Sequence, residues 1–204
     1  YALKNGFQVH KQVRRGIRLG FIENYENVTG DYIITFSPDG NSIPEIIPDL
    51  IEELKKGYDM VIVSRYMGYA KSHDDTFISM IGNWFFTKLI NCLFGFHYTD
   101  TLVIFRGYKK NIPEKLKLTK VRSDFYEKYI GRYISWEPTL TMRCAKYRMK
   151  ITEIPGDEPK RIEDENNSSF GNILLPSTRI NHFRAGFACL YAVFEEFYKK
   201  KEKY

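Results

Sequence analysis

Cysteine and histidine are scarce in this sequence, and long uninterrupted apolar runs are missing. The three cysteines lie far apart and form no CxxC pair, which excludes a disulfide framework or a cysteine-rich metal site and is typical of a reducing compartment: Cys92, Cys144 and Cys189. The four histidines show no paired spacing, and we interpret them as structural or exposed: His10, His73, His97 and His182. No run reaches the length of apolar residues that a transmembrane helix needs, and no signal-peptide pattern opens the chain.

The composition is that of a folded domain with a modest excess of positive charge. The chain has 204 residues, of which 43% are hydrophobic and 16% aromatic, enough for one domain with a sizeable core. Its net charge of +6 permits an anionic partner without naming one. No nucleic-acid-binding motif accompanies this charge, so we expect no nucleic-acid partner.

Apolar periodicity predicts alternating helices and strands in the first part of the chain. Val9, Val13 and Ile17 are four residues apart and predict a helix over 8–23. The stretch after it predicts a strand, a helix that Gly57 ends, and a second strand that is apolar throughout: 32–36, 44–56 and 59–63. Short connections between these elements favour a right-handed crossover onto a parallel sheet.

The same signals continue to the end of the chain. They predict a long apolar helix over 77–94 and a third strand over 101–105, and then an irregular or helical region over 110–135. A helix, a short strand, a long polar loop and a final helix follow: 138–146, 150–154, 155–176 and 181–201. We therefore expect an α/β fold with a mostly parallel sheet, divided into a main domain over 1–180 and a C-terminal amphipathic helix over 181–204.

A carboxylate follows the first predicted strand. In SPDG, Asp39 lies between Pro38, which stiffens the turn, and Gly40, which lets a ligand approach the backbone. Ligands of open parallel sheets bind beyond the carboxyl ends of the strands, and one carboxylate there can hold a divalent cation that bridges a diphosphate. The alternative is an ordinary Asx-type turn.

The second strand ends in Ser64-Arg65. An arginine at this position suits bidentate binding of phosphate; the alternative is an Arg–Asp ion pair that only ties loops together. We interpret Asp74 and Asp75, in the loop that follows, as solvated charge before a helix that begins at Thr76.

Several blocks together resemble family 2 glycosyltransferases, the group that includes dolichol-phosphate mannose synthases and their bacterial relatives. The core block over 29–66 reads TGDYIITFSPDGNSIPEIIPDLIEELKKGYDMVIVSRY. The resemblance continues through Asn83, the Asp100-Thr101 pair, SWEPTLTMRCAK and KITEIPGDEPKRI, and it spans roughly residues 5–165.

This resemblance implies a Rossmann-like GT-A fold and an inverting glycosyltransferase. The expected donor is a nucleotide-diphosphate sugar, the expected acceptor a lipid phosphate or a polysaccharide, and the expected cofactor Mg²⁺ or Mn²⁺. Residue by residue, it implies that Asp39 is a metal ligand and catalytic residue and that Glu137 is the carboxylate beside the acceptor. It also implies that four residues contact the donor diphosphate or its surroundings: Ser37, Arg65, Asp100 and Arg161.

Glu137 has a role that depends on the acceptor. A hydroxyl acceptor needs a general base, whereas a lipid phosphate is already largely ionised and needs none, so that Glu137 would position it. The alternative is a carboxylate that satisfies backbone N–H groups at a helix start.

The sequence also departs from the family pattern. Ser37 replaces the first Asp of the Asp-x-Asp metal motif, and Glu163, Asp164 and Glu165 lie where relatives place glycines and a basic residue. The usual N-terminal strands are missing, so we expect a domain incomplete at its N-terminus, because a sheet without them has an unpaired hydrophobic edge. These departures leave open a non-catalytic GT-A-like module, and the missing N-terminus leaves open a sugar-phosphate nucleotidyltransferase.

The predicted C-terminal helix has one apolar side followed by a lysine-rich end. Its apolar residues are Phe183, Phe187, Leu190, Phe194 and Phe197, and residues 199–203 carry four lysines. We expect this side to pack onto the sheet; the alternative is docking on an anionic bilayer. The expected location is the cytoplasm, and docking would place the protein at the inner face of the membrane.

Overall fold

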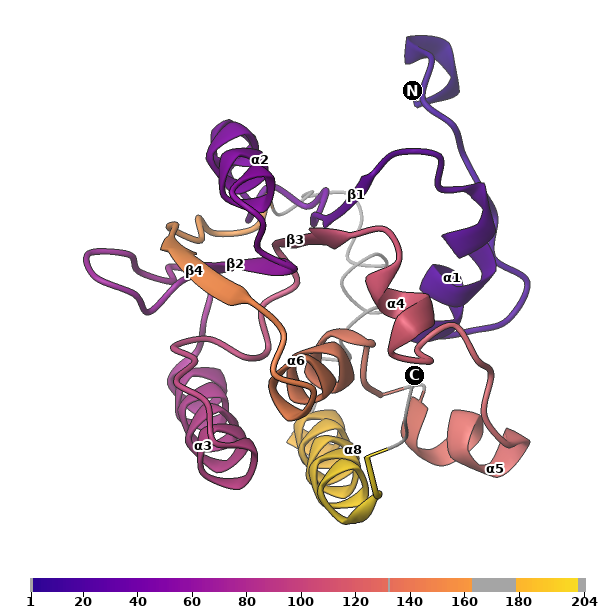
Figure 1. The fold of residues 1–204 in the computed structure, drawn as a ribbon, viewed down its shortest axis with the longest axis vertical. Helices are drawn as coiled ribbons and strands as arrows, with labels where there is room; N and C mark the ends of the chain where they lie inside the picture. The colour runs from indigo at the N-terminus through magenta and orange to yellow at the C-terminus, as the bar shows by residue number, and fades with distance from the viewer. Residues whose placement is uncertain (1, 132, 163–178, 202–204) are drawn as a thin grey trace.

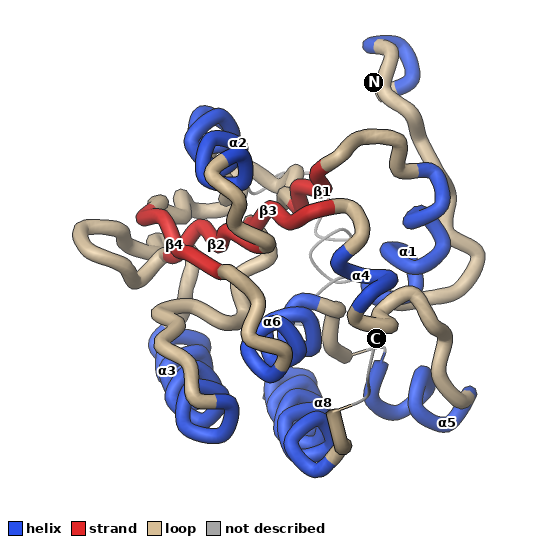
Figure 2. Tube along the Cα trace, viewed as in Figure 1, coloured by secondary structure: helices blue, strands red, loops and turns tan. Residues whose placement is uncertain are grey.

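The computed structural model describes residues 2–131, 133–162 and 179–201, in which a four-stranded sheet is flanked by helices. The strands are β1 (Tyr32–Thr35), β2 (Met60–Ser64), β3 (Arg106–Lys109) and β4 (Ile151–Pro155). The α-helices are α1 (Ile17–Asn24), α2 (Ile47–Lys55), α3 (Phe77–Phe94), α4 (Ile112–Lys115), α5 (Asp124–Tyr126), α6 (Glu137–Lys146) and α8 (Arg179–Tyr198). Shorter turns are η1 (Leu3–Asn5), η2 (Tyr25–Asn27), η3 (Pro44–Ile46) and the π-type η4 (Glu127–Gly131). The predicted α/β class is confirmed (Figures 1 and 2).

The sheet is mixed, in the order β1-β3-β2-β4. β3 lies between β1 and β2 and is antiparallel to both, while β4 is parallel to β2. The strands β1, β2 and β4 therefore run in the same direction, although β1 and β2 are not neighbours. The expected parallel pairing of the first two strands is wrong, but their carboxyl ends still lie at one edge of the sheet.

The third strand lies later in the chain than the sequence predicts. Residues 101–105 form no strand, and β3 begins at Arg106. The Arg106 side chain is fully buried and donates hydrogen bonds to the carbonyl oxygens of Thr101 and Val103 and to Oγ1 of Thr141. These bonds hold the apolar segment as a buried loop, because they use backbone acceptors that a strand ladder would otherwise occupy.

The first predicted helix is half as long as expected. Residues 8–16 are not helical, and Val9 and Val13 are exposed. Gly16 has φ +120°, outside the right-handed helical region, so α1 begins only at Ile17. The predicted helices over 44–56, 77–94 and 138–146 agree with the structure to within a residue or two, counting η3 with α2.

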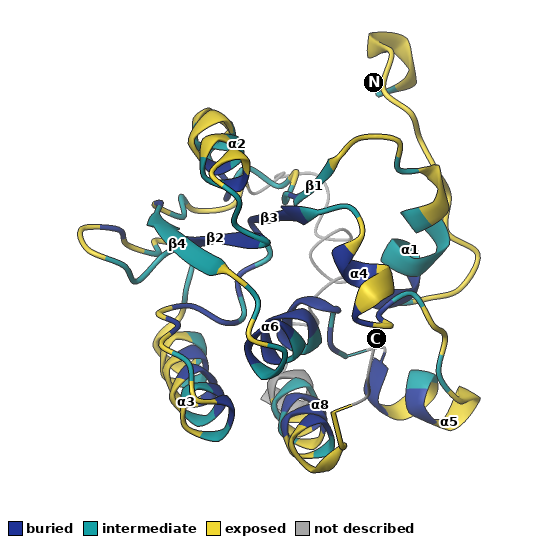
Figure 3. Ribbon diagram, viewed as in Figure 1, coloured by how far each residue is buried: buried dark blue, intermediate teal, exposed yellow. Residues whose placement is uncertain are grey.

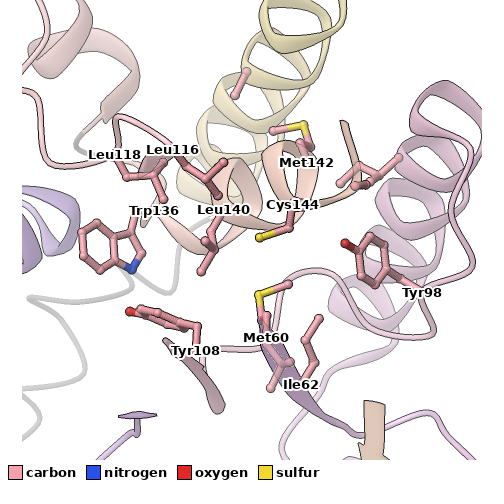
Figure 4. Packing of buried hydrophobic residues seen from close by; sticks show 14 of the residues in the cluster. Met60, Ile62, Tyr98, Tyr108, Leu116, Leu118, Trp136, Leu140, Met142 and Cys144 are labelled. Atoms are coloured by element: carbon pink, nitrogen blue, oxygen red, sulfur yellow. The ribbon is translucent and has the colours of Figure 1, made fainter. Parts of the chain in front are cut away.

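The core lies on both faces of the sheet. α2 covers one face, and α3, α6 and α8 lie on the other (Figure 1). β2 is buried along its whole length, and Figure 3 shows it within the buried centre of the molecule. α2 packs directly onto Gly107 of β3, since a Cβ there would collide with Leu50. Figure 4 shows the second face, where Tyr108 and Trp136 lie next to each other, with ring centroids 6.3 Å apart.

The helix α8 belongs to the same core. It packs against α6 and α3 through Ala188, Cys189, Ala192 and Val193, which are buried. The expectation that its phenylalanine side packs onto the sheet is wrong, because Phe183, Phe187, Phe194 and Phe197 are exposed. Most of the predicted polar loop over 155–176, with Glu163, Asp164 and Glu165, lies outside the described residues. By length and composition α3 could cross a membrane, which corrects the expectation that no segment has this property.

Candidate functional site

Three loops meet at the edge of the sheet where β1, β2 and β4 end. The backbone N–H of Ile162, after β4, donates a 2.9 Å hydrogen bond to the carbonyl oxygen of Asp39, after β1. Ser72, after β2, forms a parallel bridge with Glu158. Gly40 permits the close contact between the first and last loops, because a Cβ there would collide with Ile162. We call one group of linked side chains, most of them on these loops and one in the segment before β3, the loop edge: Ser37, Asp39, Arg65, Asp74, Asp75, Asp100, Glu158 and Arg161.

Arg65 is the centre of a buried ion-pair cluster in the loop edge. Its side chain is 11% exposed and binds Asp100 with two hydrogen bonds, Nε to Oδ2 at 2.7 Å and Nη2 to Oδ1 at 3.1 Å. Nη1 lies 2.9 Å from Oε2 of Glu158 and 3.4 Å from Oδ2 of Asp75. Burial acts to lower the pKa of Arg65, but these carboxylates, Asp100 above all, raise it well above its usual value.

The carboxylates around Arg65 are held in place by further contacts. Asp100 is fully buried, and its backbone N–H donates to Glu153, whose pKa is raised by burial. Burial likewise raises the pKa of Glu158, although Arg65 opposes this shift. The Tyr66 hydroxyl donates to Asp75. Arg65 therefore forms the ion pairs that the alternative interpretation of this residue expected. Its main partner is Asp100, which we predicted to lie near the donor.

A second and more exposed group contains Asp39. Nε of Arg161 lies 3.3 Å from Oδ2 of Asp39 and 2.9 Å from Oδ2 of Asp74. Ser37 donates a 2.6 Å hydrogen bond to the other oxygen of Asp39. The Asp39 and Arg161 side chains are 37% and 40% exposed, so a ligand in solvent can reach both.

The two groups are connected through neighbouring residues. Asp74 binds Arg161, and the next residue, Asp75, binds Arg65. Glu158 binds Arg65 and accepts a 3.4 Å hydrogen bond from Asn41, which follows Asp39 by two residues. Asp39 and Arg65 thus lie in one connected network without touching each other.

Three members of the loop edge were missed from the sequence. The interpretation of Asp74 and Asp75 as solvated charge is wrong, because both are ion-paired, and Glu158 was not singled out. Thr76 does begin α3, and its side chain accepts from the backbone N–H of Ser79. The available signal was the position of these acids in the loops that follow the carboxyl ends of β2 and β4, with Glu158 three residues after β4.

The loop edge has an excess of negative charge that bears on metal binding. It has five carboxylates against two guanidinium groups: Asp39, Asp74, Asp75, Asp100 and Glu158, with Arg65 and Arg161. Within the described ranges, no group of three or more Asp, Glu, His or Cys side chains could hold a metal ion. Asp39 and Asp74 do converge on one Arg161 nitrogen, and two carboxylates suffice for a cation that takes its other ligands from phosphates.

Glu137 has no contact with the loop edge among the interactions of the described residues. It begins α6 as predicted, but it is fully buried, and neither carboxylate oxygen has a hydrogen-bond partner. Burial raises its pKa, although the nearby Arg106 opposes this shift. No backbone N–H donates to this carboxylate with ordinary hydrogen-bond geometry, so the structure does not support the helix-start alternative, and an acceptor can reach Glu137 only after a rearrangement.

A basic cavity of about 200 Å³ lies elsewhere, between α1, α6 and α8. It contains none of the predicted site residues. Its cationic lining residues are Arg18, Lys117, Lys120, Arg122, Arg143, Lys146, Lys199 and Lys200.

Comparisons with known proteins agree with the family resemblance. The family model described as "Glycosyl transferase family 2" matches residues 4–117. An undecaprenyl-phosphate 4-deoxy-4-formamido-L-arabinose transferase from Aeromonas hydrophila is 26% identical over 110 residues, which are 54% of this chain and 32% of the relative. A dolichol-phosphate mannosyltransferase from Pyrococcus furiosus is 31% identical over 84 residues, or 41% and 21% of the two chains. The arabinose transferase from Enterobacter sp. (strain 638) is 27% identical over 150 residues, or 74% and 40%. The chain thus spans less than half the length of these relatives.

Proposed function

Because this chain belongs to glycosyl transferase family 2, we propose that it acts in the transfer of a sugar, with inversion, from a nucleotide-diphosphate sugar to a lipid phosphate. The resemblance found in the sequence is confirmed by the family match. Because residues 4–117 match a glycosyl transferase model, the match also argues against the alternative of a sugar-phosphate nucleotidyltransferase. The relatives named for undecaprenyl phosphate and dolichol phosphate support the choice of acceptor.

The convergence of three loops at the carboxyl edge of β1, β2 and β4 is the observation that carries this proposal. Negative charge builds up on the leaving nucleotide diphosphate during transfer, and preorganised positive groups stabilise it. Arg161 is accessible and paired with carboxylates that are themselves partly exposed, so it contacts the diphosphate. Arg65 is saturated by buried carboxylates and acts as a positioning residue that fixes the loops after β2 and β4.

The proposal includes a divalent cation, Mg²⁺ or Mn²⁺, held by Asp39 and Asp74. The cation would supply further neutralisation of the leaving diphosphate. Ser37 would not bind the cation directly. Its hydroxyl donates a hydrogen bond to Asp39 and holds that carboxylate in place. The residue at the first position of the metal motif thus orients the second.

The burial of Glu137 supports a lipid phosphate over a hydroxyl acceptor. A carboxylate with no exposed surface is poorly placed to take a proton from an acceptor hydroxyl, whereas an ionised phosphate oxygen needs no base. We therefore expect Glu137→Gln to keep its transfer activity towards polyprenyl phosphate in the full polypeptide. Loss of turnover with unchanged binding of the sugar nucleotide would contradict this assignment.

A non-catalytic binding module is the second candidate. The saturation of Arg65 by carboxylates and the serine at position 37 favour it. Isothermal titration of sugar nucleotides into a polypeptide that includes this whole chain, with and without Mn²⁺, distinguishes the two.

The titration has a matched control. The enzyme proposal expects metal-dependent binding that Asp39→Asn weakens about tenfold or more, because the cation that would bridge the diphosphate loses one of its two carboxylate ligands. Asp49→Asn, an exposed carboxylate on α2, should leave binding unchanged. Absence of binding, or equal binding in the two variants, would favour the module.

Contact with a membrane also belongs to the proposal. A lipid phosphate lies at a bilayer surface, so the protein would act at the inner face of the cytoplasmic membrane. The exposed aromatic side of α8 and the lysines after it are compatible with this location.

A further inference from the structure

The helix α3 has an exposed apolar stripe that the sheet and its neighbours leave uncovered. Six large side chains on it are exposed and recur at helical spacing: Phe77, Ile78, Met80, Ile81, Trp84 and Phe85. Phe77 is 72% exposed and Trp84 61% exposed. Single exposed apolar residues are normal, but a continuous row of this size indicates a binding surface.

The opposite side of α3 is anchored in the domain. Phe86, Ile90 and Phe94 are buried in the core. Thr87 is also buried, and its hydroxyl lies 3.0 Å from that of Thr101. Although α3 is long and apolar enough to cross a bilayer, spanning would remove these residues from the core. The folded domain therefore presents the stripe as a surface.

The helix α8 packs beside α3 and has an exposed aromatic side of its own. Phe94 of α3 and Phe197 of α8 are in edge contact, with ring centroids 6.3 Å apart. The exposed aromatic residues of α8 also recur at helical spacing: Phe183, Phe187, Tyr191, Phe194 and Tyr198. Both helices lie on the side of the sheet opposite α2, and Figure 3 shows exposed residues along each. We call the exposed residues of these two helices the α3–α8 face.

The charges of the α3–α8 face are complementary to an anionic surface. α3 contains no acidic residue, and its single charge is the exposed Lys88. On α8, Glu195 pairs with Arg122 and Lys199, while Glu196 is buried against Arg143. The other exposed charged residues of the face and its end are cationic: Lys88, Arg184, Lys200 and Lys201.

Trp and Tyr side chains among lysines are typical of the interface between lipid headgroups and acyl chains. A second protein copy would instead have to bury these like charges against each other. The composition of the face therefore favours a lipid surface.

The face begins beside the loop edge. Thr76, the N-cap of α3, follows Asp75 directly, so Phe77 and Ile78 lie within four residues of Asp74 and Asp75. We propose that the α3–α8 face docks on the surface of an anionic bilayer and so holds the loop edge at the depth of the phosphate headgroups. The docking itself is argued from the exposed residues and their charges. The placement of the loop edge at the phosphate headgroups rests on the proposed function.

Sedimentation with vesicles tests the docking. The protein is mixed with vesicles of phosphatidylcholine alone or of phosphatidylcholine with phosphatidylglycerol, and no sugar nucleotide is added. The proposal expects binding to the anionic vesicles that weakens with salt. The double variant Trp84→Ser/Phe85→Ser should lower the partition coefficient about tenfold or more, because two large apolar side chains no longer enter the interface.

Two further variants and a spectroscopic signal complete the test. Phe125→Ser removes an aromatic residue that is 72% exposed on α5, outside the face, and should bind as the wild type does. Lys88→Glu changes only charge and should weaken binding to anionic vesicles. Trp84 is exposed and Trp136 is buried, so a blue shift of the fluorescence on vesicles reports insertion of Trp84.

Equal binding of the double variant and the wild type, or equal binding to both kinds of vesicle, would overturn the proposal. So would self-association without lipid that the double variant abolishes, since the face would then contact a second copy. Failure of sugar-nucleotide binding in the calorimetric experiment would leave the vesicle result unaffected, so the two proposals can fail separately.

Discussion

Replacing Asp100 by alanine removes the main partner of a buried guanidinium group. The Arg65 side chain is 11% exposed, the Asp100 side chain is fully buried, and two hydrogen bonds join them. Breaking a buried ion pair by removing one partner costs about 3–5 kcal/mol, because the remaining charge stays buried. Glu158 and Asp75 still contact Nη1 of Arg65 and retain part of the compensation. We therefore expect a loss near the lower limit, about 3 kcal/mol.

Urea denaturation at neutral pH, followed by circular dichroism, measures this loss. Lys56→Ala is the matched control, because it removes one partner of an exposed ion pair with Glu53 and should leave stability unchanged within error. A loss below about 1 kcal/mol for Asp100→Ala would refute the buried cluster, since that is the range of exposed pairs. Restoration of most of the stability by Arg65→Met in the Asp100→Ala background would confirm that an unpaired charge is the cause.

Further predictions concern Glu137 and two glycines. The folded state raises the pKa of Glu137, so it binds this proton more tightly than the unfolded state does, and the carboxylate should destabilise the fold as pH rises above about 4.3. Glu137→Gln should accordingly gain stability over the wild type at pH 8 and not at pH 4, as measured by urea denaturation at both values; an equal difference at both would contradict the shift. Gly107→Ala should destabilise by about 1–3 kcal/mol, because the added methyl collides with Leu50. Gly82→Ala on α3 has open space and should stabilise by about 1 kcal/mol, so similar thermal shifts for both glycine variants would contradict the packing of α2 on β3.

Strong periodicity and capping signals were enough to predict several elements. The helix α3 has a mostly apolar sequence, a threonine N-cap and a glycine after its last residue, and its predicted bounds were correct. The strand β2 is apolar without alternation and is buried on both faces. Both elements follow from local chemistry that the chain carries with it.

The apolar run over 101–105 shows where local chemistry fails. A short apolar segment is compatible with a strand or with a buried loop, and periodicity does not separate them. The deciding contacts come from Arg106 and from Thr141 on α6, 35 residues further along the chain. A long-range partner of this kind is invisible in the local pattern.

The candidate site was predictable in position but not in its contacts. Asp39 and Arg65 were found because each follows a strand that ends at the same edge. Their partners Asp74, Asp75 and Glu158 depend on how the loops after β2 and β4 pair, which the sequence does not specify. The burial of Glu137 depends in the same way on the packing of α6 beneath β3, shown by Trp136 against Tyr108.

The transfer reaction itself tests the central claim, that the loop edge binds the donor diphosphate and that Arg161 contacts it. Transfer of labelled sugar from nucleotide-sugar donors to polyprenyl phosphate is measured for the full polypeptide and for its Arg161→Ala and Asp49→Asn variants. The account predicts that Arg161→Ala lowers kcat about 100-fold or more, the loss expected for a charge-stabilising group, while Asp49→Asn keeps the wild-type rate. Transfer by Arg161→Ala at the wild-type rate would contradict it.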